Sequence, residues 1–220
     1  MCGRNSLFIP QSDLEDRLDA DVASDVEYRP RYNIAPGSSL EVVTNEAPGE
    51  IVQHHWGLLP FWADEIDDGY INARSETAHE KRAFKNAWEK RPCLVLSSGF
   101  YEWQQTNGGP KQPYRVYREG DDPTIAMAGL WQTTTIGNED VQSVTILTTD
   151  PNDVVAPIHD RMPVVLPEDE EQTWLSAGPD ERRDLCHPYP DNDLDAYPIS
   201  TLVNNPSNDD ARVIEPAETE

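Results

Sequence analysis

The stretch that decides the expected fold is CLVLSSGFYEW, residues 93–103. Its first part, 93–98, is a short apolar run that predicts a buried strand, and a glycine separates it from a second predicted strand over 100–105. Alternation along the second strand puts Glu102 on the same face as Phe100. A carboxyl among aromatic side chains has a raised pKa and can transfer protons near neutrality. Glu102 is therefore a candidate acid–base residue, and the alternative is an ordinary strand residue that faces solvent.

The same periodicities extend the prediction along the rest of the chain. Strands are expected at 40–44, 51–56, 113–118, 125–131, 141–149 and 162–166, and helices at 11–20, 75–91, 151–156 and 168–176. The segment 56–62, WGLLPFW, is too rich in aromatic residues, Gly and Pro for regular structure, and it indicates a buried turn or an aromatic shelf. Strands scattered among helices, with no repeat and no linker, predict one mixed α/β (α+β) domain.

The charge of the chain is extreme. The 220 residues carry a net charge of −24, with four Lys against thirteen Arg. This profile is typical of adaptation to molar salt, and the alternative is an ordinary acidic protein that avoids nucleic acid. Against this background, residues 70–118 carry a net charge of +5, whereas residues 151–220 carry −13. The basic segment indicates either an anion site or a solvated helix face.

The cysteines give no sign of a disulfide framework or of a zinc site. Cys2, Cys93 and Cys186 show no CxxC pairing, which favours a reducing compartment. No leader-like or membrane-spanning run is evident, so we expect a soluble, cytoplasmic protein. No phosphate-binding glycine loop occurs, and no cofactor and no metal are predicted.

Cys2 follows Met1 directly, and removal of Met1 would create an unusual nucleophile. The α-amine and the thiol would then lie on one residue, as a 1,2-aminothiol. Such a pair condenses with an aldehyde: the amine forms an imine, and the thiol adds to it and closes a thiazolidine ring. The reference pKa values, about 7.7–8.0 for the amine and about 8.5 for the thiol, make both nucleophiles accessible near neutrality. From its position alone, residue 2 could equally be a cysteine by chance.

Two more segments are dense in polar residues. One is INARSET, residues 71–77, and the other is PIHDRMP, residues 157–163, which carries His159. A lone histidine is a candidate acid–base residue or a structural hydrogen-bond donor. Together with Cys2 and Glu102, Asn72 and His159 form a plausible set for covalent catalysis.

The ordered motifs of the chain resemble one family. MCGR, RYNIAPG, WGLLPFW, INARSET, GFYEW and IHDRMP occur in the order that is typical of SRAP (SOS response-associated peptidase) proteins, also called abasic site processing proteins. The resemblance covers roughly residues 1–205 and implies a single SRAP-like domain with a barrel-like core of mixed and antiparallel sheets and flanking helices. Residues 206–220 are then expected to form an acidic, flexible tail.

The resemblance also implies a reaction and a partner. In that family Met1 is removed, in part autocatalytically, and the exposed Cys2 forms a thiazolidine crosslink with an abasic site in single-stranded DNA. Asn72 would hold the Cys2 amine or the opened sugar, and Glu102 would move protons during ring opening and crosslink reversal. His159 would assist Schiff-base formation and strand scission. Such a protein, expected to be a monomer, would associate with the nucleoid when bound to DNA.

Six further residues are expected at the DNA. The resemblance implies phosphate contacts by three arginines, a DNA-facing surface shaped by two residues of RYNIAPG, and an aromatic wedge against the bases. The three arginines are Arg4, Arg74 and Arg161. The two residues of RYNIAPG are Asn33 and Pro36, and the aromatic wedge is Trp62. The segment 148–152, TTDPN, departs from the family pattern, which leaves the phosphate contacts there open.

The acidic balance is the larger departure from the family pattern. Phosphate contacts weaken steeply as salt rises, so we infer that stacking and covalent capture dominate over electrostatic attraction. Two other readings stay open. One is an N-terminal-cysteine peptidase that acts on protein substrates, which would cleave unrelated peptides. The other is a non-catalytic single-stranded-DNA binding module, which would function unchanged without Cys2.

Overall fold

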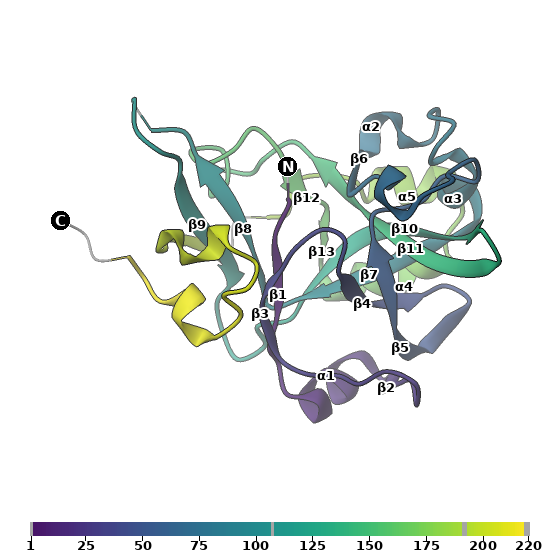
Figure 1. Ribbon diagram of the computed structural model, residues 1–220, viewed down its shortest axis with the longest axis horizontal. Coiled ribbons are helices and arrows are strands. Elements are labelled where there is room, and N and C mark those ends of the chain that lie inside the picture. The colour runs from purple at the N-terminus through teal and green to yellow at the C-terminus, as the bar shows by residue number, and fades with distance from the viewer. Residues whose placement is uncertain (1, 107, 191–192, 218–220) are drawn as a thin grey trace.

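The computed structural model describes residues 2–106, 108–190 and 193–217, which fold around two β-sheets (Figure 1). The larger sheet runs in the order β12-β11-β10-β7-β4-β5-β2. Its strands are β2 (Asp21–Val22), β4 (Ser39–Thr44), β5 (Ala47–Trp56), β7 (Pro92–Ser97), β10 (Ile125–Ile136), β11 (Glu139–Thr149) and β12 (Met162–Pro163). Two short strands join it at the side, namely β6 (Asn72–Arg74) on β11 and β13 (Val165–Leu166) on β10.

The larger sheet closes on itself. A parallel pairing of β11 with β5, at Ser143 with His55 and Val144 with Trp56, joins the two ends of the run β5-β4-β7-β10-β11. The longest of these strands, β10 and β11, are dominated by buried apolar residues. Both faces of such a sheet must be covered, which favours closure of the sheet into a barrel. The predicted mixed α/β domain with a barrel-like core is therefore confirmed.

The smaller sheet carries the N-terminal strand in its interior. Its order is β14-β9-β8-β1-β3. The strands are β1 (Asn5–Leu7), β3 (Arg31–Ile34), β8 (Gly99–Gln104), β9 (Gln112–Arg118) and β14 (Leu194–Pro198). Only one residue, Ser98, separates β7 from β8, so the chain passes from the barrel into the smaller sheet at this point.

Short helices cover the sheets. They are α1 (Gln11–Leu18), α2 (Ser75–Ala78), α3 (Lys85–Lys90), α4 (Glu168–Ser176) and α5 (Pro179–Asp184), with 3₁₀ turns η1 (Ile66–Asp68), η2 (Thr201–Asn204) and η3 (Ala211–Ile214). The buried rings of Trp88 from α3 and Trp174 from α4 meet edge to face with centroids 6.3 Å apart. None of the helices among the described residues is long and apolar enough to span a bilayer.

The predicted helix over 75–91 is wrong in its middle. The chain forms α2 and α3 with turns between them, because Phe84 turns inward and packs edge to face on Tyr70, 5.3 Å between centroids. The brief helix expected at 151–156 is also wrong. Asn152 organises turns there instead, since its side-chain oxygen accepts a hydrogen bond from the Val155 N–H at 3.1 Å.

The segment predicted as a loose tail is described as far as residue 217. In this part η3 packs on the smaller sheet through Val213, which is fully buried. The Asp209 carboxylate accepts hydrogen bonds from the backbone N–H groups of Tyr32 and Asn33, at 2.5 and 2.9 Å. These contacts fasten the described end of the chain to β3.

Gly99 makes the passage from β7 to β8 possible. Its φ is +142°, and a Cβ at this position would lie 2.8 Å from the Val116 carbonyl oxygen on β9. Only glycine combines this backbone conformation with so close an approach.

We predict that Gly99→Ala lowers the free energy of unfolding by about 1–3 kcal/mol, because the substitution adds both backbone strain and a clash. Denaturant titration followed by tryptophan fluorescence measures this change. Gly49→Ala is the matched control, since a Cβ there would meet nothing within 4 Å. Equal stabilities of the two variants would contradict the prediction.

Candidate active site

β1 brings the N-terminal segment to the centre of the smaller sheet. Asn5 pairs with Phe100 and Ser6 with Gly99 on β8. One residue earlier, the Tyr101 N–H donates to the Arg4 carbonyl oxygen at 3.1 Å, so the antiparallel register continues toward the N-terminus. This register brings Cys2 beside β8, close to Glu102.

Asn72 holds Cys2 from the other side. Its side-chain Nδ2 donates to the Cys2 carbonyl oxygen at 2.8 Å, from the first residue of β6. The Asn72 Oδ1 is buried and has no hydrogen-bond partner among the described residues, so it is available to a further donor. Cys2 itself is fully buried, and burial, with the nearby Glu102 carboxylate, raises the pKa of its thiol. The thiol is therefore protonated near neutral pH.

Glu102 lies in the strand with only 2% of its surface exposed. Burial raises the pKa of its carboxyl to about 7. Removal of a carboxylate from water disfavours its charged form, which explains the direction of the shift. A group with this pKa can both donate and accept a proton near neutrality, which is the property that the sequence predicted for it.

His159 lies on the loop between β11 and β12, and its backbone neighbours fix its ring. The His159 Nδ1 lies 3.0 Å from the Arg161 backbone nitrogen and 3.2 Å from the Arg161 carbonyl oxygen, so Nδ1 contacts the Arg161 backbone in either tautomer. Burial lowers the pKa of His159, which keeps the ring neutral at pH 7. The Gln104 side chain donates to the Pro157 carbonyl oxygen at 2.8 Å and so ties this loop to the end of β8.

Arg161 is buried and already paired. Its guanidinium makes a two-pronged contact with Glu76, at 2.6 and 2.9 Å, and a contact with Asp150 at 3.0 Å. It also donates to the Thr148 carbonyl oxygen at 2.6 Å. Two carboxylates therefore offset its charge, and they fix the start of α2 against the loop that carries His159.

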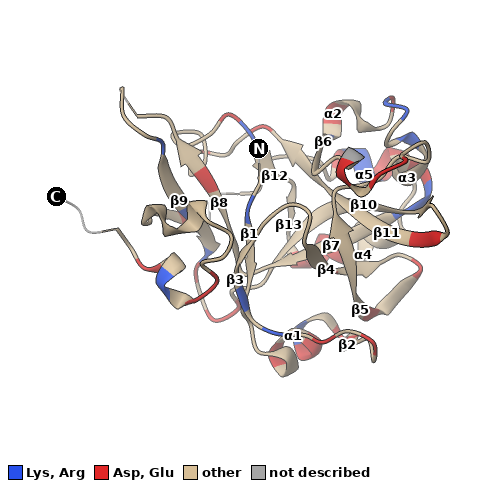
Figure 2. Ribbon diagram, viewed as in Figure 1, with Lys and Arg blue, Asp and Glu red and all other residues tan. Residues whose placement is uncertain are grey.

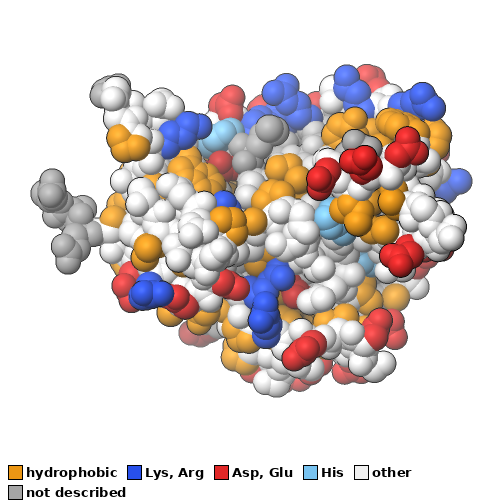
Figure 3. Space-filling view, viewed as in Figure 1, with side chains coloured by type: hydrophobic (Ala, Val, Ile, Leu, Met, Phe, Trp, Pro, Cys, Tyr) orange, Lys and Arg blue, Asp and Glu red, His pale blue; other side chains and the backbone are white. Residues whose placement is uncertain are grey.

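A groove of about 450 Å³ begins at Asn72. Trp62 and Arg74 also line it, and its rim carries Lys81 and Arg82. Three of the residues predicted from the sequence thus share one groove, and its cations all come from the basic segment 70–118. Figures 2 and 3 show the basic residues near α2 and α3 and along the adjoining edge of the molecule.

An exposed aromatic pair stands at the end of this groove. Phe61 is 67% exposed and Trp62 is 40% exposed, and their rings meet edge to face at 4.8 Å. The Arg82 guanidinium lies over both rings, 5.1 Å from the Phe61 centroid and 4.6 Å from that of Trp62. Of the predicted aromatic shelf, Trp56 and Leu58 are buried and this pair faces solvent. Phe61 belongs to the predicted aromatic shelf and Arg82 to the basic segment, but their contact was not predicted, because no local pattern reveals a contact across 21 residues.

The other predicted DNA contacts lie apart from the groove lining. Arg4 is partly exposed and donates to the Asn204 carbonyl oxygen at 3.4 Å. Asn33 is buried, and its side chain donates to carbonyl oxygens of the segment 203–208. Pro36 is exposed and lines a separate hollow of about 270 Å³ beside Trp56.

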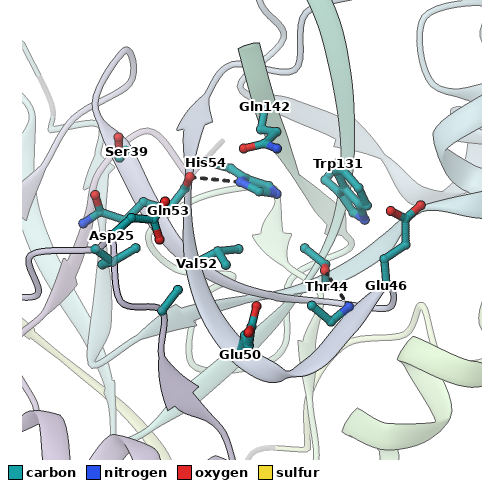
Figure 4. Close-up of a pocket in the computed structure, with 13 residues that line it drawn as sticks. Asp25, Ser39, Thr44, Glu46, Glu50, Val52, Gln53, His54, Trp131 and Gln142 are labelled. Atoms are coloured by element: carbon teal, nitrogen blue, oxygen red, sulfur yellow. Dashed lines mark hydrogen bonds between the residues drawn. The ribbon is translucent and has the colours of Figure 1, made fainter. Parts of the chain in front are cut away.

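A further cavity lies away from these residues. It has a volume of about 540 Å³, and its lining includes His54 and Trp131 (Figure 4). It shares no lining residue with the groove at Asn72. No group of three or more His, Cys, Asp or Glu side chains within 2–106, 108–190 and 193–217 could hold a metal ion.

Comparisons with known proteins agree with the geometry. Residues 1–206 match the family described as SOS response associated peptidase (SRAP). The chain is 36% identical to the abasic site processing protein YoaM of Bacillus subtilis, over 98% of both chains. It is 30% identical to the abasic site processing protein YedK of Escherichia coli, over 98% of this chain and all of that relative.

The fold is likewise similar to a solved structure. A crystal structure of a protein from Bacteroides thetaiotaomicron superposes with a TM-score of 0.88 at 28% identity, and the match covers 99% of this chain and 100% of the other.

The raised pKa of Glu102 predicts a pH dependence of stability. The pKa, about 7 in the folded protein, lies above the ordinary value of 4.5, so the folded state binds this proton more tightly than the unfolded state. The resulting stabilisation is fully present below about pH 4.5 and is lost as the pH rises through 7. Relative to Glu102→Gln, the wild-type protein should lose about 2 kcal/mol of unfolding free energy between pH 5 and pH 8. Denaturant titrations of both proteins at these pH values measure the difference, and parallel profiles would exclude the raised pKa.

Proposed function

Because the chain belongs to the SOS response-associated peptidase family, we propose that it captures abasic sites in single-stranded DNA through a covalent bond to Cys2. Relatives across nearly its full length are named abasic site processing proteins. The observation that carries the proposal is the hydrogen bond from Asn72 to the Cys2 carbonyl, next to a carboxyl with a pKa of about 7. This set stands at the head of a groove with a basic rim and exposed aromatic rings.

The reaction begins after hydrolysis of the bond between Met1 and Cys2. The Cys2 amine attacks the aldehyde carbon of the opened abasic sugar and water leaves, which forms an imine. The thiol sulfur then adds to the imine carbon, its proton passes to the nitrogen, and the thiazolidine ring closes. The balance is one aldehyde and one aminothiol giving one thiazolidine and one water. The raised pKa of the thiol favours attack by the amine first.

Glu102 and His159 divide the proton transfers. The closed sugar must open before it can react, and opening moves a proton from the hydroxyl to the ring oxygen. A carboxyl with a pKa near 7 suits both halves of that transfer. His159 is neutral at pH 7, and in the tautomer that carries the proton on Nε2 it donates to the hydroxyl that leaves as water when the imine forms. Glu102 and His159 also act in two further steps. One is the removal of Met1, at least in part by self-cleavage, and the other is an abasic-site lyase step. Met1 itself lies outside the described residues.

The DNA strand follows the groove. Arg74 is exposed on its rim and Arg4 is partly exposed near Cys2, so both are phosphate contacts in this proposal. Arg161 remains a predicted contact, but the carboxylates of Glu76 and Asp150 offset its charge. We therefore expect Arg74 to contribute more to affinity than Arg161. Asn33 acts through the segment 203–208 that it holds, and Pro36 shapes the surface beside the groove.

Base stacking carries affinity in this acidic protein. At about 1 M salt the Debye length is about 3 Å, so a chain with a net charge of −24 gains little from distant phosphate attraction. Stacking of a base on an aromatic ring gives about 1–3 kcal/mol and depends less on salt. Phe61 and Trp62 supply such rings, and the Arg82 guanidinium lies over both of them.

The central test is the intact mass of the protein after incubation with a single-stranded oligonucleotide that carries one abasic site. We expect an adduct of the chain without Met1 plus one strand, stable to heat. Without reduction, Cys2→Ala should give no heat-stable adduct. Cys2→Ser keeps the amine but lacks the thiol, so its adduct should survive only after reduction with borohydride.

Cys186→Ser is the matched control, because it removes a partly exposed cysteine outside the site and should leave the adduct unchanged. No adduct from wild-type protein that has lost Met1, at any salt concentration, would overturn covalent capture. Cleavage of unrelated peptides would then favour the peptidase, and unaltered binding by Cys2→Ala would favour the binding module.

A separate prediction concerns Arg82. Arg82→Gln should weaken binding of undamaged single-stranded DNA about fivefold, and the loss should persist at about 1 M salt, because a cation over aromatic rings stabilises their position by about 1 kcal/mol. Fluorescence titration at low and high salt measures both values. Arg91→Gln is the control, since Arg91 lies over Trp131 at 4.8 Å, away from the groove. A loss that disappears at high salt would indicate that Arg82 acts through its charge alone.

A further inference from the structure

The cavity at His54 lies at one end of the closed barrel, outside the proposed site. Its walls come from β4 and β5, from β10 and β11, and from the loop after β2. The rings of His54 and Trp131 meet inside it with centroids 5.4 Å apart. Both side chains are more than nine-tenths buried.

His54 presents an unsatisfied acceptor in this cavity. Its Nδ1 lies 3.0 Å from the Gln53 carbonyl oxygen and donates to it, as the dashed line in Figure 4 marks. Burial lowers the pKa of the ring, so the ring is neutral and Nε2 carries a lone pair. Nε2 is buried and has no hydrogen-bond partner among the described residues. A buried acceptor without a partner favours a ligand that brings an N–H or O–H donor.

The negative charge of the lining residues favours a positively charged ligand. Asp25, Glu46 and Glu50 contribute carboxylates, and none of the described residues that line the cavity is Lys or Arg. Figure 4 shows Asp25 near one end, Glu46 at the opposite end and Glu50 between them. Val52 and the Trp131 ring supply apolar walls between the charges, and the Arg91 guanidinium lies over the Trp131 ring, 4.8 Å from its centroid. A ligand with cationic groups at both ends and a hydrocarbon middle matches this pattern.

Acidity alone does not single out this cavity. A second acidic hollow, of about 290 Å³, is lined by Glu15, Asp16, Asp19 and Asp21. Among the described residues that line it, none is aromatic and none has a buried side-chain atom that lacks a partner. The two hollows are therefore a natural pair for comparison, because they share the charge and differ in the other features.

We propose that the cavity at His54 is a binding site for a linear organic diamine, with its two ammonium groups at Asp25 and Glu46 and an N–H of one of these ammonium groups directed to the His54 Nε2. A guanidinium at one end would satisfy the same groups. The site is separate from the groove at Asn72, so the proposal stands independently of the abasic-site reaction.

Calorimetric titration of the full chain, without DNA, tests this proposal. The probes are 1,4-diaminobutane and n-butylamine, at low salt and at about 1 M NaCl, where diffuse attraction is screened beyond about 3 Å. We expect saturable binding of one diamine per chain, at least tenfold tighter than the monoamine. Glu46→Gln/Glu50→Gln should weaken it at least tenfold. Both residues are exposed, so the variant should fold.

The control is Asp16→Asn/Asp19→Asn, which removes the same charge from the other acidic hollow and should leave the dissociation constant unchanged. A second readout is the ¹⁵N signal of the His54 Nε2, which should shift on saturation. Equal weakening by both double variants, or heat that never saturates, would show only diffuse cation binding and overturn the proposal. Binding of a lysine-rich peptide without binding of the diamine would also overturn it, in favour of a protein partner.

Discussion

A buried hydrogen-bond network between β1 and the β7–β8 junction determines where the N-terminus lies. The Asn5 side chain donates to the Leu96 carbonyl oxygen at 3.1 Å and accepts from the Ser97 hydroxyl at 2.7 Å. The same hydroxyl accepts from the Gly99 N–H at 2.9 Å, and the Ser6 hydroxyl donates to the Gly99 carbonyl oxygen at 2.6 Å. A satisfied polar network in a buried place admits one register, because any slip would leave its groups without partners.

This register sets the site. With β1 fixed against β8, Cys2 comes to lie between Asn72 of β6 and Glu102 of β8, although the three residues are separated by 70 and 30 positions in the chain. β6 in turn depends on its parallel pairing with β11 in the barrel, where Asn72 is opposite Ile146. The candidate site therefore lies where the larger and the smaller sheet meet.

The sequence predicted the long strands well, because alternation and apolar runs are local properties. It also predicted the raised pKa of Glu102, since its aromatic neighbours adjoin it in the chain. β1 and β6 escaped notice because each is three residues long and polar in part. The partners of Arg161 could not be predicted either: Glu76 lies 85 residues away, and only the tertiary fold reveals that it forms an ion pair with the arginine. The roles of the site residues remain predictions, whereas their proximity is a property of the fold.

The interior position of β1 has a consequence for synthesis on the ribosome. β1 needs β3 on one side and β8 on the other, and β8 is not complete until residue 104 has been made. At about 5–20 residues per second this takes on the order of 10 s. In the later part of that interval the start of the chain has left the ribosome but cannot complete its sheet. Enzymes that trim nascent chains therefore have a window in which Cys2 is accessible, and the window closes when the sheet forms around it.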